Sequence, residues 1–84
     1  MQFEGAVLKE QGITFAIVVV KSHVINSSNR ESVRQSFVPY FPNMPIILMA
    51  QDSRGIPTYH GRTDIAKFLA NLHISQIPWK RYTA

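Results

Sequence analysis

The residues with the most capacity for chemistry lie in two stretches, Asp52 to Arg62 and Trp79 to Tyr82. In the first stretch, Arg54 and Arg62 flank a turn and the expected start of a helix, whose free N–H groups attract anions. These residues could therefore hold a phosphate group. The other interpretation, which the turn-forming composition favours, is a hairpin tip with solvated arginines and the Tyr59 ring packed on a sheet.

The second stretch combines aromatic rings with the cations Lys80 and Arg81. Such a mixture suits single-stranded nucleic acid, in which the bases stack and the phosphates need counter-charges. It equally suits a protein contact, where Trp, Tyr and Arg are the usual anchors, or a tail that its own Trp holds on the core. The nucleic-acid or phosphate interpretation uses Arg54, Arg62, Lys67, Lys80 and Arg81, and the partner-contact interpretation uses Trp79, Tyr82 and Tyr59.

No combination of residues predicts catalysis or a bound metal. The histidines His23, His60 and His73 do not have the spacing of metal ligands. A serine nucleophile needs a base, an orienting acid and an oxyanion hole, and the chain has no Gly-x-Ser-x-Gly elbow. We therefore expect no catalytic residue, no metal, no cofactor and no enzymatic activity.

Composition narrows the class of protein. The chain has 84 residues, a net charge of +4, 17% charged residues and no cysteine, which predicts a single domain over residues 1–84 in a reducing cytoplasm. No run is long and apolar enough for a membrane helix, and the first residues lack the pattern of a signal peptide. The low charge leaves apolar surface to cover, which favours a homodimer or another protein partner. The positive excess permits nucleic-acid binding without requiring it.

The strongest structural signal is the run Ile13 to Ile25, which is rich in β-branched residues and predicts a long central strand. Its middle, Phe15 to Val20, has no polar residue, so both faces need a cover. A strand from Phe3 to Glu10, with Gly5 as a bulge or close-packing point, pairs with it through a turn at Gln11 and Gly12. The C-terminal tail or a second copy of the chain could cover the second face.

Helix signals follow each of two expected hairpins. Ser28 and Glu31 have capping-box spacing at the start of the first helix, and Thr63 is the expected N-cap of the second. Two strands, residues 46–50 and 56–60, lie between these helices, and Pro57 makes the second of them an edge. Residues 77–84 are expected to form an irregular tail.

The second half of the chain resembles part of a known fold over about forty residues. A proline before a strand in Met44 to Ile46, a hairpin, Gly61 and a closing helix are similar to the C-terminal portion of thioredoxin-type proteins. The resemblance implies the order strand, strand, helix for this half. It implies no redox activity, because the family's pair of cysteines has no counterpart, and the hairpin of the first half departs from the family's connection.

Together these signals predict an α+β fold of order ββα-ββα, with a mainly antiparallel four-stranded sheet and two helices on one face in a two-layer sandwich. The expected core is Phe15, Ile17, Val19, Val33, Phe37, Ile47, Met49, Ile65, Phe68 and Leu72. The expected function is a non-enzymatic protein-interaction or self-assembling module. The alternative is a module that binds nucleic acid or phosphate through a basic and aromatic surface.

Overall fold

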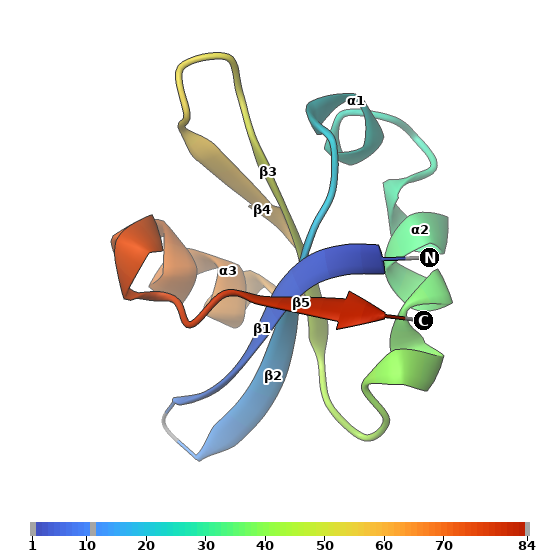
Figure 1. Ribbon diagram of the computed structural model, residues 1–84, viewed down its shortest axis with the longest axis vertical. Coiled ribbons are helices and arrows are strands. Elements are labelled where there is room, and N and C mark those ends of the chain that lie inside the picture. The colour runs from blue at the N-terminus through green and yellow to red at the C-terminus, as the bar shows by residue number, and fades with distance from the viewer. Residues whose placement is uncertain (1, 11, 84) are drawn as a thin grey trace.

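The computed structural model describes residues 2–10 and 12–83 of the chain (Figure 1). Its elements are β1 (Gln2–Glu10), β2 (Ile13–Val19), α1 (Ser22–Ile25), α2 (Arg30–Ser36), the 3-10 turn η1 (Val38–Tyr40), β3 (Ile46–Gln51), β4 (Pro57–His60), α3 (Thr63–Ala70), the 3-10 turn η2 (Ile74–Gln76) and β5 (Lys80–Thr83). The predicted α+β class is confirmed. The ββα-ββα order is present with one further strand at its end. The predicted turn residue Gln11 lies outside the described residues.

The sheet of the described ranges has five strands in the order β4-β3-β2-β1-β5. The prediction of four strands is wrong because Lys80 to Thr83, expected in an irregular tail, pair with Gly5 to Gln2 of β1. Three pairings are antiparallel, whereas β2 and β3 run parallel, with Ala16 opposite Ile46. The parallel pair arises because α1, α2 and η1 carry the chain back to the end of the sheet at which β2 began.

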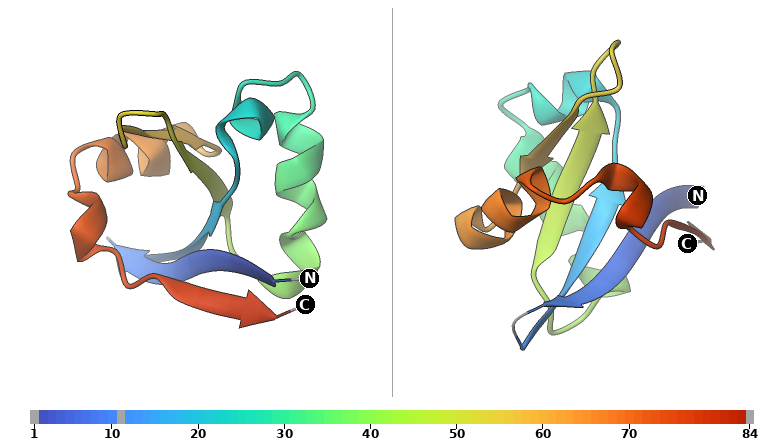
Figure 2. Two further views of the ribbon diagram at one scale, coloured as in Figure 1. Left: turned by 45° about the horizontal axis from the view of Figure 1, so that its top comes forward. Right: turned by 90° about the vertical axis from the view of Figure 1, so that its left-hand side faces the viewer.

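The two faces of β2 face different hydrophobic cores. Phe15 and Ile17 pack in one cluster with Ile65 and Leu69 of α3, whereas Ala16 and Val18 pack in another cluster. The second cluster includes Ile25, Phe37 and Phe41 from the crossover between β2 and β3. Figure 2 shows α2 and α3 on opposite sides of β2 and β3. The predicted placement of both helices on one face is therefore wrong, and the fold has three layers.

The long strand ends earlier than the sequence pattern indicates. β2 stops at Val19, and the residues from Ser22 to Ile25 form the short helix α1. The polar residues Lys21 and Ser22 cannot continue a strand that is buried on both faces, so the chain turns out of the sheet there. Because this chain's own helices cover both faces of β2, the apolar strand no longer requires a second copy.

Most of the predicted core is confirmed. The buried members are Phe15, Ile17, Phe37, Ile47, Met49 and Ile65, and the half-buried members are Val19, Val33, Phe68 and Leu72. The expected tail also contributes, because Ile77 is 4% exposed and belongs to the cluster under α3.

Two glycines lie where backbone segments approach closely. A Cβ on Gly5 would meet the carbonyl oxygen of Ile17 at 2.6 Å, which confirms the close-packing point in β1. A Cβ on Gly61, between β4 and α3, would meet Ile47 Cδ1 at 2.6 Å and the Ile46 carbonyl oxygen at 2.9 Å. Gly5 thus allows β1 to pack closely against β2, and Gly61 allows the chain at the start of α3 to pack closely against β3.

The predicted caps are wrong at both main helices. The N-cap of α2 is Asn29, that of α3 is Arg62, and neither side chain caps its helix. Glu31, expected to bond back to Ser28, accepts hydrogen bonds from Arg34 instead, at 2.9 Å and 2.5 Å. A guanidinium competes well for this carboxylate because a charge-assisted, bidentate pair is stronger than a single bond to a backbone N–H.

Candidate interaction surface

The outer edge of β5 is the feature of the fold most suited to contact another chain. Strand β1 pairs with β5 from Gln2 to Gly5, and β5 is the last strand of the sheet on that side. Figure 1 shows β5 in red beside β1, with the two ends of the chain close together. An edge strand presents unpaired N–H and C=O groups that another extended segment can join.

The direction of the main-chain groups follows from alternation along the strands. The amides of Ala16 and Val20 donate to the carbonyl oxygens of Pro45 and Met49 in or next to β3, at 2.9 Å and 2.8 Å. The main-chain N–H and C=O groups of the odd-numbered residues of β2 therefore face β1. Because β2 pairs continuously with β1, and β1 with β5, the main-chain N–H and C=O groups alternate in direction across all three strands. It leaves the main-chain groups of Arg81 and Thr83 facing outward.

The opposite edge of the sheet is blunted. In β3, the main-chain groups of Met49 face β2, so those of Leu48 and Ala50 face β4. The main-chain groups of their partners in β4, His60 and Thr58, therefore face β3. The outward positions of β4 are Pro57 and Tyr59. Pro57 has no N–H to offer an added strand, which confirms the prediction that β4 is an edge and makes it the poorer template.

An aromatic cluster supports β5 from the side of α2. Tyr82 stacks on Phe3 at the paired position of β1, with ring centroids 5.3 Å apart and ring planes at 13°. Phe41 meets Tyr82 edge-on at 5.2 Å, and Tyr40, which is 47% exposed, lies 5.8 Å from Phe3. The Lys80 ammonium lies 5.9 Å from the centre of the Tyr82 ring, within reach of a cation–π contact. These contacts hold the edge strand in place from one face.

The two other predicted partner contacts are mainly internal. Trp79 packs against the cluster under α3 and its Nε1–H donates to the Ile74 carbonyl oxygen at 3.1 Å. Tyr59 packs on the same cluster, and its buried hydroxyl has no hydrogen-bond partner among the described residues. Burial raises the pKa of this hydroxyl above its usual value. Of the three predicted contacts, Tyr82 alone belongs to the β5 edge.

The predicted cations do not gather on one surface. Arg54 lies in the β3–β4 turn, at one edge of the sheet, and Lys80 and Arg81 lie on the strand at the other edge. Arg62 and Lys67 lie at the start and in the middle of α3. Three of the five contact carboxylates, with Arg54 3.7 Å from Asp52, Arg62 2.9 Å from Asp64 and Arg81 3.8 Å from Glu4.

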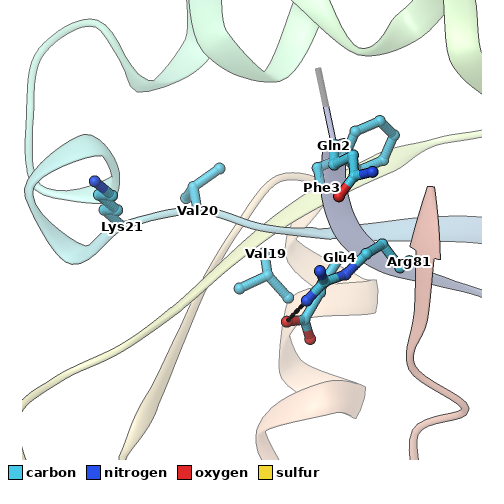
Figure 3. A pocket seen from close by; sticks show the side chains of 7 residues that line it. All are labelled: Gln2, Phe3, Glu4, Val19, Val20, Lys21 and Arg81. Atoms are coloured by element: carbon cyan, nitrogen blue, oxygen red, sulfur yellow. Dashed lines mark ion pairs between the residues drawn. The ribbon is translucent and has the colours of Figure 1, made fainter. Parts of the chain in front are cut away.

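A groove lies where β1 and β2 part, and we call it the end groove. Its volume is about 420 Å³, and it is lined by Gln2, Phe3, Glu4, Val19, Val20, Lys21 and Arg81 (Figure 3). β1 pairs with β2 from Gly5 onward, and its first residues continue beside β5. Sequence reasoning misses this site because it places Lys21 within the long strand predicted from Ile13 to Ile25.

A polar cluster that the sequence analysis missed joins α2 to β4. Glu31 accepts from Arg34 and Gln35 and lies 3.1 Å from His60 Nε2, and Arg34 donates to the Ile46 carbonyl oxygen at 3.3 Å. The Arg34 hydrogen bond, opposed in part by desolvation, brings the pKa of the Glu31 carboxyl to about 2. The sequence suggested a different role for Glu31, because its spacing from Ser28 matches a capping box. Its contact with His60 joins residues that are 29 positions apart, which local spacing does not predict.

Within residues 2–10 and 12–83, no group of three or more His, Cys, Asp and Glu residues could hold a metal ion. None of the helices described there is long and apolar enough to span a membrane. Comparison with protein-family models, with curated proteins and with solved structures finds no match for this chain. The proposals below therefore depend on the geometry of the chain alone.

Proposed function

We propose that this protein is a non-enzymatic interaction module that binds an extended segment of another protein along the outer edge of β5. The observation that carries the proposal is the difference between the two sheet edges. Pro57 blunts the β4 edge, whereas Arg81 and Thr83 present outward main-chain groups on β5. Strand addition to an open edge is a recurrent way of recognising a peptide, in which main-chain hydrogen bonds supply affinity.

Charge favours an acidic segment as the partner. Lys80 and Arg81 both lie on β5, and the chain as a whole carries a net charge of +4. In a second copy of the chain, an antiparallel β5 would bring the same cations against this edge, and like charges on facing strands oppose pairing. Self-assembly through β5 therefore has less support than binding of an acidic partner in the cytoplasm.

Nucleic-acid binding is the alternative, and it has weaker support. Its predicted cations are divided between opposite edges of the sheet and α3, and Arg54, Arg62 and Arg81 already contact carboxylates. Phosphate recognition along a strand of nucleic acid needs cations that follow one continuous path. The remaining argument in favour of nucleic-acid binding is that the Lys80 ammonium lies next to the Tyr82 ring, so that a cation for a phosphate and an aromatic ring for a base are close together.

Selection from a library of random linear peptides on the immobilised protein tests the proposal. We expect enrichment of acidic sequences of high β-propensity. On addition of a selected peptide, the amide signals of Arg81 and Thr83 should move in ¹⁵N–¹H spectra. No enrichment, or shifts confined to the β4 edge, would contradict the proposal, and dimerisation through β5 would replace it with self-assembly.

Two variants separate main-chain pairing from charge. Arg81→Pro removes an outward N–H without removing a bond to β1, and it should abolish peptide binding. Arg81→Gln keeps the N–H and should weaken binding about threefold. Arg54→Gln, at the far edge, is the matched control and should bind as the original protein does. Circular dichroism and thermal melts check that each variant is folded.

A further inference from the structure

We propose that the end groove binds a small organic carboxylate with an apolar body. This ligand is distinct from the partner segment of the proposed function and lies on the other side of β1 from the β5 edge. The proposal depends on the lining of the groove, its charge and its place in the sheet.

The apolar part of the groove lining suits the hydrocarbon chain of a ligand. Val19 and Val20, at the end of β2, and Phe3, in β1, are each half-buried. Figure 3 shows Val19 and Val20 between the segment bearing Lys21 and the segment bearing Glu4. Val19 packs on the α3 side of the sheet, and Val20 and Phe3 pack on the α2 side. A ligand chain in the gap between β1 and β2 would therefore contact apolar side chains on both faces and lose contact with water, which is the main source of affinity in such sites.

The rim of the groove carries an excess of positive charge. Lys21 and Arg81 provide two cations and Glu4 one carboxylate. The contact between Arg81 and Glu4 is long, at 3.8 Å, and both side chains are more than half exposed. None of the ion pairs among the described residues involves Lys21. Both cations can therefore turn toward an incoming anion at small cost.

The balance of charge selects a singly charged ligand. Glu4 leaves a net charge of +1 at the rim, which one carboxylate neutralises, whereas a phosphate dianion would leave a net charge of −1 next to Glu4. The site also lies beyond the carboxyl end of β2, beside the parallel β2–β3 pair.

The other groove of similar size does not support the same argument. It also has a volume of about 420 Å³ and lies between Gly55 to Pro57 and Ala70 to Ile74. No Lys or Arg lines it, so its charge does not specify a ligand.

A ¹⁵N–¹H titration of the protein with hexanoate tests the proposal. We expect saturable shifts at the amides of residues 2–4 and 19–21. Hexanol, which has the same chain without the charge, and acetate, which has the charge without the chain, should each bind at least fivefold more weakly. Inorganic phosphate, which also lacks the chain, should likewise bind at least fivefold more weakly than hexanoate. Equal responses to hexanoate and acetate, or no saturable shift with hexanoate, would overturn the proposal.

Variants on one side of β1 keep this proposal separate from the proposed function. Lys21→Gln should raise the Kd for hexanoate about threefold. Val20→Ser should raise this Kd further by making the lining of the groove more polar. Both variants should leave peptide binding at β5 unchanged. Lys67→Gln, on the exposed face of α3, is the control and should change neither. Thr83→Pro, which removes an outward N–H of β5 and lies outside the lining of the groove, should abolish peptide binding yet preserve the hexanoate shifts at residues 19–21. Unchanged hexanoate affinity in Lys21→Gln would contradict the assignment of the site.

Discussion

Trp79 donates its indole N–H to the carbonyl oxygen of Ile74 across 3.1 Å, and this bond fastens the start of β5 to the turn η2. The same ring packs against the cluster under α3. We expect Trp79→Phe to lose about 1 kcal/mol of unfolding free energy with the hydrogen bond. Trp79→Ala should lose about 3 kcal/mol because packing is also lost. Urea unfolding measures both. Unchanged stability in Trp79→Ala with loss of peptide binding would instead make Trp79 a partner contact.

Sequence patterns predict the elements of this fold better than their arrangement. The β1–β2 hairpin and α3 are evident because a Gly-containing turn between two extended runs, and the spacing of Ile65, Phe68 and Leu69, are local signals. Local patterns do not specify which side of a sheet a helix covers. A continuously apolar strand such as β2 offers two equivalent faces, so the opposite placement of α2 and α3 was missed.

The candidate site was predictable only in part. The stretch from Lys80 to Tyr82 was recognised by its residue types, but its conversion to a strand depends on pairing with β1 at the far end of the chain. Four residues of mixed polarity carry too little alternation to predict a strand. The same non-local pairing draws Gln2 and Phe3 toward β5 and opens the end groove.

Gly5 should not tolerate a side chain. A methyl group there would lie 2.6 Å from the Ile17 carbonyl oxygen, and backbone cannot yield as a flexible side chain can. We expect Gly5→Ala to lower the unfolding free energy by about 2 kcal/mol. Gly55→Ala is the matched control, because Gly55 has a φ of 82° but no atom within 3.4 Å of its added Cβ, so strain in φ costs about 1 kcal/mol. Equal losses in denaturant unfolding would show that the close contact relaxes.

The Glu31 carboxyl should contribute to acid stability. Its pKa in the folded protein is about 2 and its ordinary value is 4.5. A lowered pKa stabilises the fold above the unfolded value, so this contribution is present at pH 5 and is lost as the pH falls toward 2. The side chain is 51% exposed, so we expect less than about 1 kcal/mol. Urea unfolding at pH 5 and pH 2.5 should show a smaller acid loss in Glu31→Gln than in the original protein. An identical loss would contradict the assignment.

The buried hydroxyl of Tyr59 should reduce stability, because it lacks a hydrogen-bond partner among the described residues. Leaving such a group unpaired costs about 1 to 3 kcal/mol, so Tyr59→Phe should raise the unfolding free energy, by about 1 kcal/mol once the lost packing is included.

Burial also raises the pKa of the Tyr59 hydroxyl. The unfolded chain therefore ionises first as the pH rises past 10, and stability falls there. Tyr59→Phe should remove this part of the alkaline loss. Tyr40→Phe, at a site 47% exposed, is the control and should change little. A clear loss of stability in Tyr59→Phe at neutral pH would show that the hydroxyl has a partner in solution.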